Sequence, residues 1–235
     1  MKLDALVIAA HPDDAEISVG GTLLRLVDAG KKVGIVDVTR GEMGSRGTEA
    51  DRDAETAAAN ELLGVSVRLN LGAPDGRVQV TLELRERLAA ILREHAPDIV
   101  LAHYEQDPHP DHVASGRLAR EAWYLAGLKR LAQGGKQARR PKRLLSFLSH
   151  TPFEPTFVVD VSPVWPRKVE LVRCYASQLE PAGEGDKGEH FLYGADILRR
   201  METKARTWGE RIGVAQGEPL LVHGPLPIGD VERLF

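Results

Sequence analysis

The stretch Leu3-Asp-Ala-Leu-Val-Ile-Ala-Ala10, followed at once by His11-Pro-Asp-Asp14, decides the fold predicted for this chain. After its charged start, the first part is continuously apolar, which is typical of a central parallel strand covered on both faces. A helical pattern follows from about residue 15 to residue 29, and Gly30 is well placed to end it. The stretch therefore predicts the first strand–loop–helix unit of an α/β protein, with polar residues in its loop.

The same alternation continues along the chain. Further strand-like runs cover about residues 33–38, 65–71 and 98–103, and helical patterns cover about residues 48–63, 81–95 and 111–131. Such alternation predicts a mainly parallel sheet with right-handed connections, in a three-layer, Rossmann-like core over about residues 1–135. The less regular remainder has strand-like runs at about 144–149 and 156–161 and helical patterns at about 163–178 and 193–213. We expect residues 136–235 to form a smaller α+β part that covers the substrate.

Bulk composition limits the classes of function. The 235 residues are 43% hydrophobic and 28% charged, which fits a single domain over 1–235 with a sizeable core. The formal net charge of −3 gives no overall attraction to nucleic acid or to an anionic membrane. The apolar run at 5–10 is too short for a signal segment or a membrane span. Cys174 is the only cysteine, which excludes an intramolecular disulfide and a thiolate zinc cluster and favours a reducing cytoplasm.

Two short motifs carry side chains suited to metal chemistry. The first is His11-Pro-Asp-Asp14, and the second is His109-Pro-Asp-His112, which follows the strand that ends near residue 103. Ligands bind open α/β sheets at the carboxyl ends of the strands, so both loops are expected to line one crevice. Two imidazoles and a carboxylate, from His11, Asp14 and His112, form a three-ligand set for zinc that leaves one position for water. Zinc would lower the pKa of that water to ~7.

The remaining polar residues of these motifs are candidates for acid–base chemistry. Asp13 adjoins a predicted ligand and is free to act as general base. If His109 is protonated it can donate a hydrogen bond to a developing oxyanion, and Asp111 can keep it charged or oriented. The simpler alternative is that Asp14 and Asp111 only cap their helices.

A third segment, Thr39-Arg-Gly-Glu-Met-Gly-Ser-Arg-Gly-Thr48, leaves the second strand and is expected to line the same crevice. Its glycines allow the backbone to approach a ligand closely. Arg52 offers a fork of donors for hydroxyls or a carboxylate, unless it is an exposed residue paired with Glu55. The basic segment 136–143 is either a solvated loop or an anion-binding rim. The other histidines are expected to be surface or internally satisfied groups: His95, His103, His150, His190 and His223.

These motifs resemble a known family. AHPDD at 10–14, TRGEMGSRGT at 39–48 and HPDH at 109–112 are similar to motifs of the LmbE-like, or PIG-L, superfamily of zinc-dependent N-acetylglucosaminyl deacetylases, and the similarity runs along essentially the whole chain. The C-terminal third looks most like the deacetylases of bacillithiol biosynthesis, through the phrases FVVDV at 157–161, CYASQ at 174–178, GERIG at 209–213 and GEP at 217–219.

The resemblance implies particular roles for residues of this chain. It implies that His11, Asp14 and His112 bind zinc, with Fe²⁺ as the alternative metal in the cell. It also implies that Asp13 is the base and that His109, tuned by Asp111, stabilises the tetrahedral intermediate. Two residues are implied as substrate contacts: Arg52 and, near the C-terminal helices, Tyr193. Members of the group assemble as trimers or hexamers, so a homo-oligomer is expected.

The predicted activity is hydrolysis of the acetamide of an N-acetylglucosaminyl conjugate, and the resemblance favours N-acetylglucosaminyl-malate. Conjugates of the chitobiose type are the second substrate class. A metal-dependent phosphoesterase is a rival, although only one metal's worth of ligands is apparent. A non-catalytic zinc-binding or nucleotide-binding module is another. It is disfavoured because the first turn lacks GxGxxG and because its acidic pair would repel a pyrophosphate.

Overall fold

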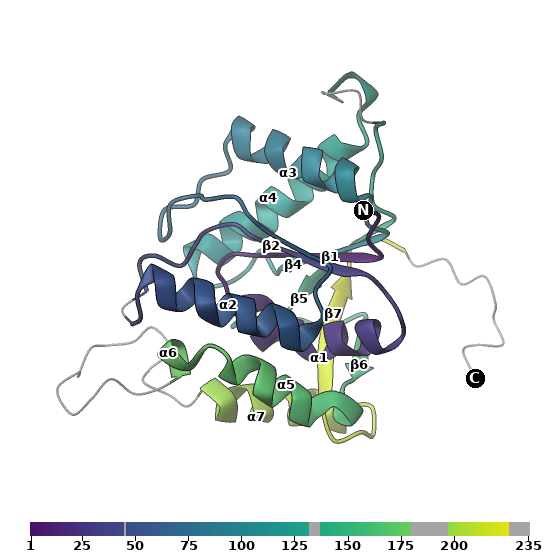
Figure 1. Cartoon of the computed structure of the whole chain (residues 1–235). Helices are drawn as coiled ribbons and strands as arrows, with labels where there is room; N and C mark the ends of the chain where they lie inside the picture. Colours follow the sequence, from purple (N-terminus) through teal and green to yellow (C-terminus); the bar gives the residue numbers. More distant parts are fainter. Residues whose placement is uncertain (45, 132–136, 180–196, 226–235) are drawn as a thin grey trace.

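A seven-stranded sheet runs through the molecule in the order β3-β2-β1-β4-β5-β7-β6. The computed structural model describes residues 1–44, 46–131, 137–179 and 197–225 (Figure 1). The strands are β1 (Ala5–Ala9), β2 (Val33–Asp37), β3 (Val67–Asn70), β4 (Ile99–His103), β5 (Arg143–Phe147), β6 (Phe157–Asp160) and β7 (Gly217–Val222). The helices are α1 (Asp14–Asp28), α2 (Glu49–Leu63), α3 (Leu82–His95), α4 (Pro110–Ala126), α5 (Trp165–Arg173), α6 (Ala176–Leu179) and α7 (Ile197–Glu210).

The sheet is mainly parallel, as predicted. Strands β3, β2, β1, β4 and β5 pair in parallel, and β7 then pairs antiparallel with both β5 and β6. Strand β7 was missed in the sequence. It begins Gly217-Glu-Pro219, and proline weakens the signal of a strand that is paired on both sides because it donates no ladder hydrogen bond. The chain order reverses between β1 and β4, which places a crevice at the carboxyl ends of these two strands.

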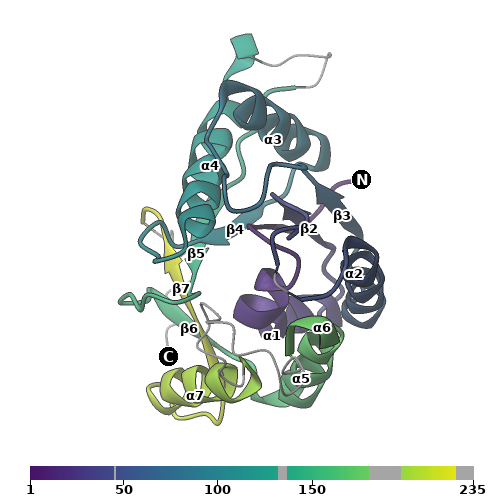
Figure 2. The ribbon, with the colours of Figure 1, turned by 90° about the vertical axis from the view of Figure 1, so that its left-hand side faces the viewer.

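Helices cover both faces of the sheet, which makes the three-layer architecture. In Figures 1 and 2, α3 and α4 lie on one face and α1 and α2 on the other, with α5 packed against α1 and α2. The apolar run of β1 is buried on both faces of the sheet, because its side chains alternate between two core clusters. Val7 belongs to the core cluster under α1, whereas Leu6 and Ile8 belong to the cluster under α3 and α4. All three side chains are fully buried.

Several predicted helices differ in length. The pattern at 163–178 is broken into a 3-10 turn (Ser162–Val164), α5 and the short α6. The pattern at 111–131 is divided into α4, which ends at Ala126 with Gly127 as its C-cap, and a 3-10 turn at Lys129–Leu131. The first residues of the pattern at 193–213 lie outside the described residues. Among the described residues, no helix is long and apolar enough to cross a membrane.

Close packing of α4 on β4 makes Gly116 sensitive to substitution. A Cβ atom at this position would lie 2.5 Å from the backbone oxygen of His103. Because that obstacle is backbone, Gly116→Ala must move α4, at a cost of about 1–3 kcal/mol that exceeds alanine's helix-propensity gain of ~1 kcal/mol. We expect a lower melting temperature in calorimetry, whereas Arg117→Ala, at an exposed position of the same helix, should leave it nearly unchanged. Equal melting temperatures for Gly116→Ala and the unmodified protein would contradict this packing argument.

Candidate active site

The two His/Asp motifs meet where the strand order reverses. His11 to Asp13 connect β1 to α1, and the residues before His109 connect β4 to α4. The loop after β1 is sharply bent, since Asp13 has a φ of 111°, an uncommon value for a residue other than glycine. Backbone strain of this kind concentrates at functional sites, where the surrounding structure holds it in place.

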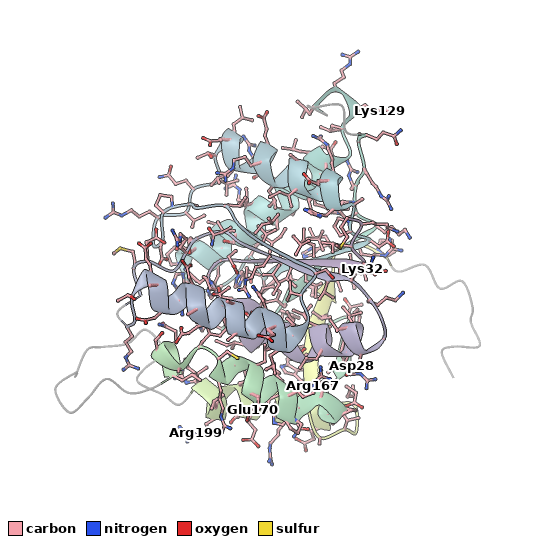
Figure 3. The ribbon with its side chains drawn as sticks, in the orientation of Figure 1. Asp28, Lys32, Lys129, Arg167, Glu170 and Arg199 are labelled. Atoms are coloured by element: carbon pink, nitrogen blue, oxygen red, sulfur yellow. The ribbon has the colours of Figure 1, made fainter. Side chains whose placement is uncertain are left out.

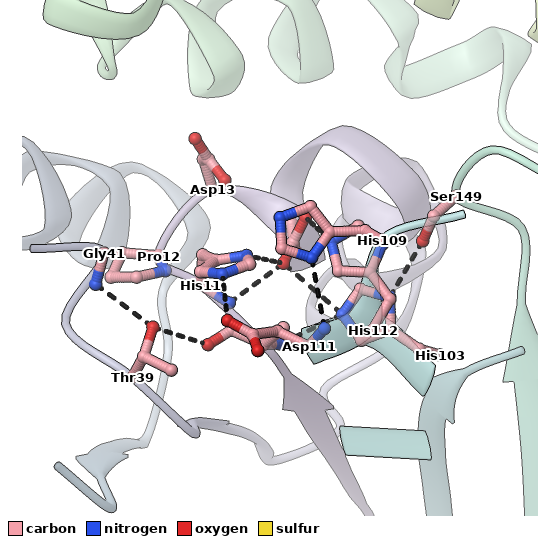
Figure 4. Close-up of polar contacts among 12 residues, drawn as sticks. His11, Pro12, Asp13, Thr39, Gly41, His103, His109, Asp111, His112 and Ser149 are labelled. Carbon is pink, nitrogen blue, oxygen red and sulfur yellow. Dashed lines mark hydrogen bonds and ion pairs between the residues drawn. The ribbon is translucent and has the colours of Figure 1, made fainter. Parts of the chain in front are cut away.

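His11, Asp14 and His112 converge, as the sequence predicted. Their ligand atoms all lie within 4.8 Å of one another. The Nδ1 atom of His11 is 3.1 Å from Oδ2 of Asp14, and Nε2 of His112 is 3.4 Å from Oδ1 of the same carboxylate. Figure 4 shows the rings grouped at the ends of the strands. The carboxylate of Asp14 therefore contacts the two histidines and does not cap α1.

Each imidazole is also held from its other side by a second carboxylate. Nε2 of His11 is 3.0 Å from Oδ1 of Asp75, and Nδ1 of His112 is 3.1 Å from Oδ1 of Asp107. Metal-bound histidines usually have such an outer carboxylate partner, which fixes the ring and its tautomer. The donor set, two imidazoles and one carboxylate with outer carboxylates, fits a zinc ion.

Without a metal, the carboxylates favour protonated rings. Burial alone would lower the pKa of His112, but Asp14 and Asp107 outweigh it and raise that pKa to about 9. The pKa of His11 is also raised well above its usual value, against the effect of burial, by Asp111, Asp14 and Asp75. The same clustering holds the pKa of Asp14 well below its ordinary value despite burial. A cation is thus favoured at this position.

Asp13 stands apart from the rings, as Figure 4 shows, and pairs with Arg52. Nη1 of Arg52 is 3.2 Å from Oδ2 of Asp13, and its Nη2 donates to the carbonyl oxygen of Pro12 at 2.8 Å. Burial raises the pKa of Asp13 to about 6, and Arg52 limits the rise. The alternative of an exposed Arg52 paired with Glu55 is wrong. Arg52 is only 6% exposed, and Glu55 instead accepts hydrogen bonds from Ser177.

His109 and Asp111 are placed differently from what the sequence suggested. The backbone N–H of Asp111 donates to Nδ1 of His109, so His109 caps α4. The Asp111 carboxylate instead accepts hydrogen bonds from the backbone of Gly76 and Val78 and lies 3.4 Å from His11. Burial, His112 and His11 lower the pKa of His109 more than the charges of Asp14 and Asp111 raise it. A neutral His109 with its proton on Nε2 is therefore favoured over the protonated ring.

Several residues of the site were not predicted from the sequence. Asp75 and Asp107 lie in loops after β3 and β4, and only their position beyond a strand end could have signalled them. His150 was expected to be a surface or internally satisfied group, and its Nδ1 atom does pair with Asp107 at 3.0 Å. Its ring also stacks on His112 at 5.2 Å, which places it in the site. His103 is internally satisfied, as predicted. Its Nε2 accepts from the N–H of Ala10 and its Nδ1 pairs with the Ser149 hydroxyl.

The His11–Asp14–His112 cluster faces a pocket of about 410 Å³. Its walls include His11, Asp13, Arg52, His109, His112 and His150. The wall from the C-terminal part comes mainly from α7. The other predicted substrate contact, Tyr193, lies outside the described residues, as does His190.

The basic segment is at the other edge of the sheet. Its described residues, 137–143, lead into the amino end of β5, whereas the pocket lies at the carboxyl ends of the strands. Arg139 and Lys142 approach Asp98, and Arg140 stacks on Trp123 and Tyr124. An anion-binding rim on this segment is therefore wrong for this pocket.

Comparisons with known proteins agree with this geometry. The chain is 32% identical to the diacetylchitobiose deacetylase of Thermococcus kodakarensis, over 74% of this chain and 69% of that protein. It is 30% identical to the 4-oxalmesaconate hydratase of Pseudomonas putida, over 74% and 73%. It is 27% identical to a probable N-acetyl-alpha-D-glucosaminyl L-malate deacetylase of Bacillus anthracis, over 74% and 80%. Among solved structures, the conserved protein TT1542 from Thermus thermophilus superposes with a TM-score of 0.85, at 40% identity over 97% of both chains.

A Rossmann-like sheet that brings a His–Asp–His cluster beside a buried carboxylate is suited to metal-assisted hydrolysis. Residues 6–123 match the PIG-L family model, described as GlcNAc-PI de-N-acetylase. The chain belongs to this family and is a deacetylase.

Proposed function

We propose that this chain is a zinc-dependent deacetylase of N-acetylglucosaminyl conjugates and that its preferred substrate is N-acetyl-alpha-D-glucosaminyl L-malate. The observation that carries the proposal is the placement of Asp13 next to the His11–Asp14–His112 cluster, in one pocket. The malate conjugate is favoured because basic side chains line this pocket and the relative from Bacillus anthracis bears that name. Conjugates of the chitobiose type remain the second candidate class, given the relative from Thermococcus.

Zinc held by His11, Asp14 and His112 would supply a water of lowered pKa and would polarise the acetamide carbonyl. In our proposal the carboxylate of Asp13 accepts a proton from the attacking water and later returns it to the leaving amine. Arg52 keeps that carboxylate facing the pocket through its hydrogen bond. The products are acetate and the free amine of a glucosamine.

His109 is proposed to stabilise the oxyanion. Its Nδ1 atom accepts the N–H of Asp111, so the ring proton lies on Nε2. A neutral imidazole fixed in this way is a preorganised donor, and a donor of this kind contributes roughly 10²–10³-fold to the rate in known oxyanion holes. Arg52 and Tyr193 remain proposed substrate contacts. A cytoplasmic location and assembly as a trimer or hexamer also remain proposals that rest on composition and family resemblance.

Removing the metal tests this function directly. We expect acetate release from N-acetylglucosaminyl-malate to fall to background after dialysis against a chelator, because all three proposed ligands serve one ion. Adding back one equivalent of Zn²⁺ should restore it, and parallel reconstitution with Fe²⁺ under anaerobic conditions compares the two candidate metals. Full activity in protein shown by elemental analysis to be metal-free would overturn the proposal. Hydration of 4-oxalmesaconate without acetate release would assign the chain to the other reaction found among its relatives.

A further inference from the structure

The ring of His103 contacts both of the motifs that carry the proposed metal ligands. His103 is the last residue of β4, and only 1% of it is exposed. Its Nε2 atom accepts the backbone N–H of Ala10, the residue before His11, at 3.0 Å. The same ring stacks on that of His112, with ring centroids 4.1 Å apart and the ring planes at 22° (Figure 4). One buried side chain therefore links the first motif to the second.

The contact with Ala10 fixes the backbone that leads into the first motif. Strand β1 ends at Ala9, and beyond it the N–H of Ala10 pairs with the His103 ring where a strand would offer a carbonyl. On the other side, Thr39 donates from its backbone N–H and from its hydroxyl to the carbonyl oxygen of Ala10, at 2.9 and 3.0 Å. Both backbone polar groups of Ala10 are thus bonded to residues at the ends of the neighbouring strands, so His11 starts from a fixed position.

Ser149 determines which nitrogen of the His103 ring carries the proton. Because Nε2 accepts the N–H of Ala10, the proton of the neutral ring lies on Nδ1. Nδ1 lies 2.9 Å from the hydroxyl of Ser149, to which it donates. In this tautomer the ring offers no proton to Asp14, although Oδ2 of Asp14 lies 3.4 Å from Nε2. The carboxylate of Asp14 is therefore left for the metal, and His103, with both ring nitrogens engaged, is not a fourth ligand.

The stack on His112 rests on the hydrophobic core. His103 packs on Phe147 at the end of β5, with ring centroids 4.6 Å apart, and Phe147 is fully buried. His112 belongs to the first turn of α4, and its Nε2 atom faces the carboxylate of Asp14. A neighbouring ring that is held by two hydrogen bonds and by Phe147 leaves the His112 side chain little freedom to turn away from Asp14.

We infer that His103 is a positioning residue of the metal site, which sets the spacing of His11 and His112 and so the affinity for the ion. This inference rests on the proposed function, because it takes the His11–Asp14–His112 cluster as the metal site. His103 is not among the residues that line the pocket. Its effect passes through the N–H of Ala10 and through the ring of His112. The expectation of an internally satisfied histidine is thus correct for its hydrogen bonds but incomplete for its role.

Two substitutions at this position separate the hydrogen bonds from the stack. His103→Phe keeps an aromatic ring against His112 but leaves the buried N–H of Ala10 without its acceptor. His103→Gln loses the ring but keeps an amide oxygen for Ala10 and an amide N–H for Ser149. We expect the zinc dissociation constant to rise about 10- to 100-fold in His103→Phe and by less than about tenfold in His103→Gln, because the hydrogen bonds set the spacing of the ligands. Competition with a chelating dye measures both constants.

Two control variants separate this role from a loss of stability. His95→Phe removes another buried histidine, at the end of α3, whose ring pairs with the carbonyl of Met1. It should lower the melting temperature, as His103→Phe does, but leave the zinc dissociation constant unchanged. Arg167→Gln breaks an ion pair with Asp28 on the surface (Figure 3), and it should change neither quantity.

Failure of this inference and failure of the proposed function give different results. An unchanged zinc dissociation constant in His103→Phe, or an equal rise in His95→Phe, would overturn the role of His103 while leaving the metal site intact. If the unmodified protein binds no zinc, the proposed function fails, and NMR of the metal-free protein tests the inference without any variant. The His103 ring should then show its proton on Nδ1, and the amide of Ala10 should exchange slowly. A ring proton on Nε2, or fast exchange at Ala10, would overturn the inference.

Discussion

Asp13→Asn should lower kcat for acetate release by about 10²–10⁴-fold, the usual worth of a general base, while leaving the bound metal in place. The substitution is a sharp test because asparagine keeps the size of the side chain and an oxygen that accepts from Arg52. Asparagine also tolerates a positive φ, so the bend at residue 13, with φ 111°, is preserved. What is removed is only the capacity of the carboxylate to accept a proton. Acetate release should be measured at saturating substrate, with metal content determined on the same preparation.

Two control variants test whether the loss of kcat is specific to the Asp13 carboxylate. Asp53→Asn changes an exposed carboxylate that pairs with Arg40 on the surface, and it should leave kcat unchanged. Asp13→Glu keeps the charge but lengthens the side chain, and partial activity there would indicate that the position of the carboxylate matters as well as its basicity. If Asp13→Asn retains full metal-dependent activity, Asp13 is not the base. If it loses the metal, its role is structural.

The orientation of Asp13 depends on a buried layer that the proposed mechanism does not itself use. The Arg52 guanidinium lies 5.8 Å from the centre of the Tyr175 ring, and the Tyr175 hydroxyl donates to Glu16 at 3.0 Å. Arg68 joins the same carboxylate at 2.5 Å and also binds Asp37 on β2 through two hydrogen bonds. Buried charges are tolerated here because each is paired. This layer contacts Arg52 through Tyr175, and Arg52 in turn donates to Asp13.

The sequence alone was sufficient for the parallel core and for the residues that act locally. His11, Asp13 and Asp14 lie at the junction of a loop with α1, and His109 and His112 lie at the start of α4, so their spacing and the strands before them place them together. Because ligands bind at the carboxyl ends of parallel strands, the two motifs were expected to line one crevice. Strand β7 was missed because Gly217 and Pro219 weaken its pattern, although tertiary pairing with β5 and β6 makes it a strand.

Contacts between distant segments could not be predicted in the same way. Asp75 is 64 positions from His11, and nothing in its local sequence identifies the ring that it approaches. The same holds for Asp107 with His150 and for the α7 wall, whose approach to the pocket depends on how the C-terminal part packs. The partner of the Asp111 carboxylate could not be predicted for a related reason. Adjacency suggested that Asp111 acts on His109, but its carboxylate turns to the loop at residues 76–78.

His112→Gln should abolish stoichiometric zinc binding, an effect as large as that of any other metal-site variant. Two candidate ligand sets share His112: one with His11 and Asp14, the other with Asp107 and His150. The first is favoured because Asp107 then serves as the outer partner of His112. We therefore expect His11→Gln to lose zinc as His112→Gln does, and Asp107→Asn to weaken binding by only about 10- to 100-fold. His150→Gln should retain one equivalent of zinc. His95→Gln, the control, should do the same, because its ring pairs with the carbonyl of Met1.

Titration calorimetry with Zn²⁺ measures all five variants. Loss of zinc in His150→Gln but not in His11→Gln would assign the metal to Asp107, His112 and His150, a set without His11 and Asp14, and would contradict the proposed site.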